Sequence, residues 1–121
     1  MAVSSEYKAF VAEIFEPLGT VEIKHMFGGA GVYYHDVMFA LIANETLYLK
    51  ADGENQEMFE AAGADRFRFT PQSGKNAGKA IAMSYWELPE ELLDDPEALL
   101  DWSRASLDAA FRAKAGKSRK A

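Results

Sequence analysis

Hydrophobic residues recur at two different spacings along the chain, and the spacing separates helices from strands. In residues 5–15 apolar side chains return every three or four positions, which predicts a helix that Ser4 or Ser5 can cap. In residues 21–26 apolar and polar side chains alternate, as in a strand with one face on a core. Further strands are predicted at residues 30–35, 37–43, 46–51, 66–70 and 80–86.

Short breaks between the early strands indicate how these strands pair. His35-Asp36 and Asn44-Glu45 leave no room for a crossover helix, so each predicts a tight turn between antiparallel neighbours. The strand at residues 37–43 is apolar on both faces, which places it in the centre of the sheet.

Two more helices are predicted after the hairpins. Met58 and Phe59 give an apolar side to a short helix that ends at Gly63. Asp95-Pro96 starts a long helix that we expect to run to about Lys114. The predicted fold class is therefore α+β, a two-layer domain with a mainly antiparallel, twisted sheet of about six strands and helices packed on one face.

Length and composition indicate one domain, residues 1–111, followed by a basic, flexible tail, residues 112–121. The chain has 121 residues, of which 49% are apolar and 26% charged. The absence of cysteine excludes disulfides, thiolate nucleophiles and cysteine zinc sites. With no secretory signal and no apolar run near the ~20 residues of a membrane span, we expect a cytoplasmic protein without membrane contact.

Charge is distributed unevenly along the chain. The total is −6, and the last ten residues carry +5, which leaves −11 on residues 1–111. The body is thus a poor match for nucleic-acid phosphates, so any such contact is confined to the tail. The candidate tail contacts are Arg112, Lys114, Lys117, Arg119 and Lys120. A solubilising tail that binds nothing is the alternative.

Known catalytic and cofactor motifs do not fit. Gly28-Gly29 opens a glycine-rich segment, but Tyr34 stands where a dinucleotide-binding loop needs its third glycine, which leaves a bulge or bend as the role of these glycines. His25 and His35 lack metal-ligand spacing, and no serine has the surroundings of a nucleophile elbow. We therefore expect no enzyme activity, no cofactor and no metal.

A small anionic ligand or an enzymatic role stays open as an alternative, because glycines and cations recur in the predicted sheet and its loops. The candidates for such a site are Gly28, Gly29, Lys50, Arg66, Arg68, Lys75 and Lys79.

Aromatic residues near the ends of predicted elements suit a protein interface. They are Phe27, Tyr33, Tyr34, Tyr85 and Trp86, and the same side chains would also fit a core. Three helices leave one face of a six-stranded sheet under-covered, which favours a homodimer.

Several separated segments resemble the TfoX N-terminal domain family in order and spacing. They lie at residues 26–33, 38–42, 47–50, 59–63, 82–89 and 95–102, so the resemblance covers about residues 5–111. Two departures are visible: Asp36 stands in a turn where relatives usually have glycine, and Trp86 replaces a usual tyrosine.

The resemblance implies a secretion-chaperone-like α+β domain of a kind that often dimerises. The family is named after a regulator of competence gene expression, in which this module precedes a second, helical domain that we expect to be missing here. It implies no catalytic residues. We therefore predict a non-enzymatic regulatory or protein-interaction module. Weak nucleic-acid association through the tail and the anionic-ligand role are the alternatives.

Overall fold

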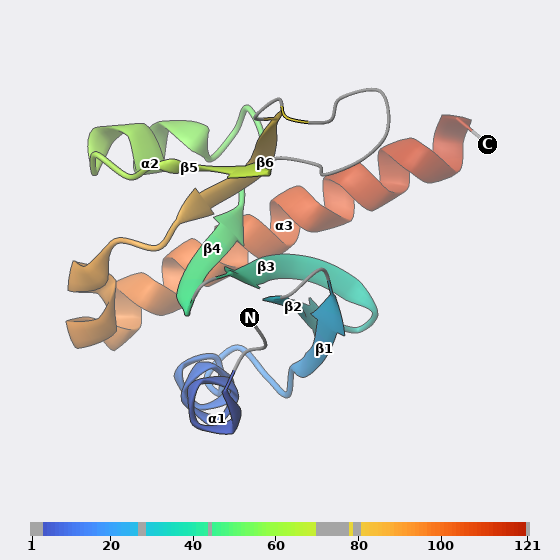
Figure 1. Ribbon diagram of the computed structural model, residues 1–121. Coiled ribbons are helices and arrows are strands. Elements are labelled where there is room, and N and C mark those ends of the chain that lie inside the picture. The colour runs from blue at the N-terminus through green and yellow to red at the C-terminus, as the bar shows by residue number, and fades with distance from the viewer. Residues whose placement is uncertain (1–3, 27–28, 44, 70–77, 79–80, 121) are drawn as a thin grey trace.

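The computed structural model describes residues 4–26, 29–43, 45–69, 78 and 81–120 (Figure 1). Its elements are α1 (Ser5–Ile14), β1 (Glu22–Met26), β2 (Gly29–Tyr34), β3 (Val37–Ala43), β4 (Thr46–Lys50), α2 (Gln56–Ala61), β5 (Arg66–Phe69), β6 (Ile81–Glu87), the 3-10 helix η1 (Glu90–Asp94) and α3 (Pro96–Lys120). The predicted α+β class is confirmed.

One six-stranded sheet has the order β1-β2-β3-β4-β6-β5, with every neighbouring pair antiparallel. The central place predicted for residues 37–43 is confirmed. The β2–β3 turn puts His35 and Asp36 at φ values of 49° and 64°. Positive φ at both turn residues matches the twist of a two-residue hairpin, although glycine and asparagine adopt it at lower cost.

The helices cover a single face of the sheet. Phe15, which follows α1, meets Phe39 of β3 edge-on at 5.1 Å between ring centroids. Phe59 of α2 stacks on Trp86 of β6 at 6.2 Å and meets Trp102 of α3 at 4.9 Å. The core lies between this helical layer and the sheet, and its largest fully buried side chains are Phe15, Phe39, Phe59, Ile42 and Leu49.

Helix ends follow the local signals. The Ser4 hydroxyl accepts a hydrogen bond from the Tyr7 amide at 3.1 Å, and the Asp95 carboxylate accepts one from the Ala98 amide at 3.2 Å. Gly63 has a φ of 74°, the left-handed conformation that ends helix α2. Both predicted caps and the predicted glycine stop are confirmed.

Helix α3 runs further than the spacing of apolar residues indicates. It continues to Lys120, past the expected end near Lys114, and in Figure 1 its last turns extend beyond the strands. The boundary expected at residue 111 therefore lies inside one helix. Alanine, lysine and arginine make up most of this stretch, and their intrinsic propensity favours helix. Among the described parts of the chain, no helix combines the length and apolarity needed to cross a membrane.

Candidate functional site

The sheet face opposite the helices, which we call the open face, carries a strip of aromatic and apolar side chains. Strand pairing places its members beside one another across β2, β3, β4 and β6. All are half-buried, whereas their neighbours on the helical face, such as Leu49 and Trp86, are buried. The strip consists of Tyr33, Met38, Leu41, Tyr48 and Tyr85.

Contacts within the open face hold its rings in place. The Tyr85 hydroxyl donates to the Met38 carbonyl at 3.5 Å, while the Lys50 ammonium lies 5.3 Å from the centroid of the Tyr85 ring. Lys24 lies over the Tyr33 ring at 4.7 Å. Burial, together with the nearby Tyr33, raises the pKa of Tyr85 to about 12, so its phenol stays neutral at physiological pH. The open face is thus apolar in its middle and carries cations among its rings.

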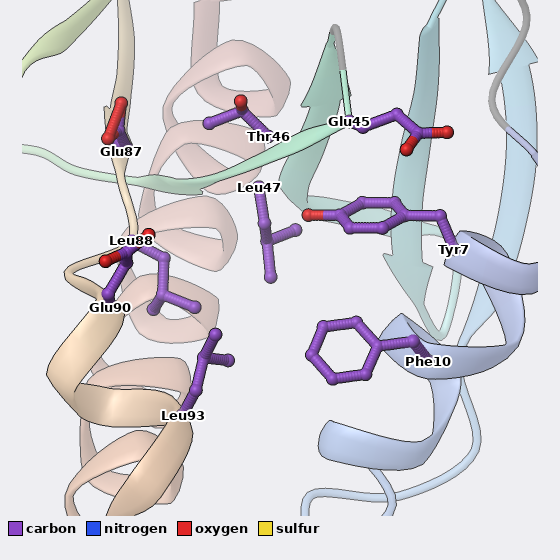
Figure 2. Close-up of a pocket in the computed structure, with 9 residues that line it drawn as sticks. All are labelled: Tyr7, Phe10, Glu45, Thr46, Leu47, Glu87, Leu88, Glu90 and Leu93. Atoms are coloured by element: carbon purple, nitrogen blue, oxygen red, sulfur yellow. The ribbon is translucent and has the colours of Figure 1, made fainter.

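A second feature is a groove of about 250 Å³ between α1 and η1, which we call the acidic groove (Figure 2). Leu47 and Leu88 line it and are buried. Phe10 and Leu93 face each other across it and are 39% and 41% exposed, respectively. The remaining lining residues are Tyr7, Thr46, Glu45, Glu87 and Glu90.

Charge in the acidic groove has one sign. Among the described residues that line it, three are glutamates and none is lysine or arginine. This negative charge acts on the tyrosine that lines the groove: burial raises the pKa of Tyr7, and Glu45 raises it further. Burial also raises the pKa of Tyr48 on the open face, with Glu87 adding to the effect. An apolar floor with a carboxylate rim suits a ligand that is apolar and cationic.

The cations proposed for an anion site do not gather at one place. Lys50 pairs with Tyr85 and lies by its ring, while Arg66 lies over the ring of Trp86 at 5.9 Å. Tyr85 and Trp86 are consecutive in a strand, so Lys50 and Arg66 occupy opposite faces of the sheet. Arg68 is exposed and donates to the Arg66 carbonyl at 3.4 Å. The described members of this set therefore form no common cradle.

Other predicted site residues serve the packing of the domain or lie outside the described part of the chain. Trp86 is only 9% exposed and belongs to the core, which leaves it little surface for a partner. A Cβ on Gly29 would lie 2.2 Å from the Ile42 carbonyl oxygen, so this glycine allows β2 and β3 to approach closely. The candidates outside the described residues are Phe27, Gly28, Lys75 and Lys79.

The basic end of α3 is anchored to the domain through its first cation. Arg112 forms a two-point ion pair with Asp52, at 2.7 and 2.9 Å, and its Nε lies 3.2 Å from Glu54. The Arg112 guanidinium lowers the pKa of the Asp52 carboxyl. Arg112 is therefore engaged within the domain, while Lys114 is exposed. The side chains of Lys117, Arg119 and Lys120 are outside the description.

Sequence reasoning missed the acidic groove, because its walls come from four separate segments. Phe10 stands at helical spacing from the other apolar residues of α1, and the acids after residue 86 form a dense run, so neither local pattern points to a groove. The one available signal was Leu93, which together with Leu88 and Leu92 interrupts the acidic stretch after residue 86. Among the described residues, no three histidine, aspartate or glutamate side chains gather as a metal site would require.

Comparison with known proteins gives the family. The TfoX N-terminal domain matches residues 13–110. The DNA transformation protein TfoX1 of Aliivibrio fischeri is 30% identical over 83 residues, which are 69% of this chain and 37% of that protein. Protein Sxy of Escherichia coli is 26% identical over 102 residues, 84% of this chain and 46% of Sxy. The chain spans less than half the length of these relatives. It belongs to the TfoX N-terminal domain family.

Proposed function

We propose that this protein is a bacterial, cytoplasmic regulatory module that acts through contacts with other proteins and catalyses no reaction. The family supports a regulatory role, since the relative from Aliivibrio fischeri is named a DNA transformation protein. A role in regulating competence or a related response is the process we propose for this chain. A homodimer is the assembly we propose.

The observation that carries the proposal is the open face. Tyrosine and methionine are enriched at the centres of protein interfaces, because they offer large contact areas with little loss of conformational freedom. Here Tyr33, Tyr48 and Tyr85 surround Met38 and Leu41 on a face that no helix of the described chain covers. Lys24 and Lys50 lie over two of these rings, and the register places Glu22 beside Tyr33 and Glu87 beside Tyr48 on the same face, so a partner would meet charges of both signs around the apolar strip.

Leu41→Lys tests the open face, with Ala61→Lys as its matched control. Leu41 lies in the middle of the strip, whereas Ala61 is exposed on α2, and both substitutions exchange an apolar residue for a lysine. A photo-crosslinking residue at Tyr48 identifies what contacts the face in native cells. We expect the same crosslinked protein with the wild type and with Ala61→Lys, and its loss with Leu41→Lys. Capture that survives Leu41→Lys would overturn the proposal.

A genetic experiment tests the regulatory role. Deleting the gene should change transformation frequency and the transcript levels of competence genes. Ala61→Lys should restore both, and Leu41→Lys should restore neither while accumulating to the same level. If deletion changes neither quantity, competence is not the regulated process.

Weak nucleic-acid binding is the second candidate, supported by the run of cations without acids at the end of α3. Since Arg112 pairs with Asp52, binding would depend on the four cations after it. Measuring DNA and RNA binding at low salt, with and without residues 113–121, decides this. Binding that is absent, or unchanged by the truncation, removes this candidate.

A further inference from the structure

We propose that the basic end of α3, residues 111–120, docks into the acidic groove of a second copy of the chain. This inference rests on the protein-contact function proposed above and specifies one contact of the proposed homodimer. The uncovered sheet face suggested a dimer from the sequence. The distribution of charge favours a contact between the copies at the acidic groove and the basic end of α3. The open face is then left for a different protein.

The acidic groove has the shape and lining of a site for an apolar side chain. Phe10 and Leu93 form opposite walls and remain about two-fifths exposed, although each is a large apolar residue. Leu47 lies between them in Figure 2, and Leu88 is buried beside it. Inserting an apolar side chain would cover both walls and remove their apolar surface from water, which favours docking.

The end of α3 supplies such a side chain together with the complementary charge. Phe111 is 41% exposed, one turn after the buried Leu107. Lys114 lies three residues further, so it shares a side of the helix with Phe111. No acid occurs in residues 111–120, whereas Glu45, Glu87 and Glu90 stand at the groove. In the docked pair, Phe111 would lie among the leucines of the groove and the lysines would lie beside its glutamates. Apolar groups would then meet apolar groups, and each positive charge would meet a negative one.

The geometry of α3 makes this a contact between two molecules. The groove is built in part by η1, which ends directly before α3 begins. A 25-residue helix is about 37 Å long at a rise of ~1.5 Å per residue. The two ends of α3 lie far apart in Figure 1, and the ion pairs of Arg112 with Asp52 and Glu54 hold the helix along the domain. The basic end therefore cannot reach its own groove.

Reciprocal docking would close the assembly at two copies. Each copy has its groove at the start of α3 and its basic segment at the end, so two antiparallel copies can exchange both contacts around a two-fold axis. In such a dimer the same contact forms twice. Once the first has formed, the second is intramolecular, which strengthens the association as a whole.

Charge exchange tests the proposal with the full-length protein. The groove variant carries Glu45→Lys and Glu90→Lys, two exposed positions, and the helix-end variant carries Lys114→Glu and Lys117→Glu. The control carries Glu57→Lys and Asp101→Lys, which make the same charge change at exposed positions that do not line the groove. Sedimentation velocity over a range of protein concentrations gives the dissociation constant of each, with circular dichroism as the check on folding.

We expect the groove variant and the helix-end variant each to raise the dimer dissociation constant at least tenfold, and the control to leave it unchanged. Mixing the two variants should restore association, because each then meets the opposite charge, and the same changes combined in one chain should restore the homodimer. Raising the salt from about 50 to about 500 mM should weaken the wild-type dimer, as expected for paired charges.

Several results would overturn the proposal. The first is a protein that stays monomeric at low salt and high concentration. The second is a dimer whose dissociation constant is unchanged by both charge reversals, and the third is a dimer that only Leu41→Lys disrupts. The last result would place the second copy on the open face. If the wild type does not self-associate while crosslinking still depends on Leu41, only the groove contact is ruled out. If charge exchange behaves as expected but no protein is crosslinked, only the function proposed for the open face is ruled out.

Discussion

Trp86 provides the sharpest test of the core, because its side chain could serve either an interface or the interior. In the structure its ring stacks on Phe59, lies under the guanidinium of Arg66 and is 9% exposed. Its indole Nε1 is buried and has no hydrogen-bond partner among the described residues. The indole is thus a packing group whose polar atom contributes nothing favourable to folding.

Two substitutions separate these contributions. Trp86→Ala removes the whole ring and should lower the free energy of unfolding by about 3–5 kcal/mol. Trp86→Phe keeps a ring against Phe59, loses about 1–2 kcal/mol of apolar burial, and removes an unpaired donor whose burial costs about 1–3 kcal/mol. The two terms nearly cancel, so Trp86→Phe should lie within about 1 kcal/mol of the wild type.

Urea unfolding followed by the fluorescence of Trp102 measures both variants, because this second tryptophan packs on Phe59 and is retained. At about 4 °C for each kcal/mol in a domain of this size, Trp86→Ala should lower the Tm by roughly 10–20 °C. An unchanged unfolding midpoint for Trp86→Ala would refute the core assignment. If Trp86→Phe proves as costly as Trp86→Ala, the indole N–H has an essential partner and the reasoning about its burial is wrong.

Three further predictions concern single positions. Gly29→Ala should destabilise the domain by about 1–3 kcal/mol in urea unfolding, because its Cβ would meet the Ile42 carbonyl. Asp36→Gly should raise the Tm, with a gain of about 1 kcal/mol, because Asp36 holds a φ of 64° that glycine adopts without strain; a lower Tm would contradict this. The folded-state pKa of Tyr85 lies near 12, above its unfolded value, so the stability it contributes is complete below about pH 10 and is lost as pH rises through 12. Comparing unfolding of the wild type and Tyr85→Phe between pH 9 and 12 should show a smaller loss in the variant.

Local signals were sufficient for the elements and for the class of fold. Ser4 and Asp95 cap helices through hydrogen bonds that span three residues, and Gly63 ends α2 through its own backbone, so the determinants are adjacent in the chain. Residues 37–43 are apolar on both faces because one face packs under the helical layer and the other carries Met38 and Leu41 in the middle of the open face, as suits a central strand.

Burial of individual side chains was less accessible to prediction. Alternation shows that Tyr85 and Trp86 point to opposite faces, but only the docking of α2 and α3 decides that Trp86 is the buried one. Phe10 and Phe111 stand at helical spacing from other apolar residues, yet both are about two-fifths exposed, because each lies where its helix has no neighbour to cover it.

The sequence by itself determined which segments form helices and strands, the antiparallel α+β plan and the contrast between an acidic body and a basic end, since each depends on neighbouring residues or on composition. Only the tertiary structure decided which surfaces these residues build. Arg112 meets Asp52 across 60 residues, and the acidic groove joins α1, β4, the end of β6 and η1. Contacts between segments so distant depend on how the helices pack against the sheet, a property of the whole fold that no local pattern of residues carries.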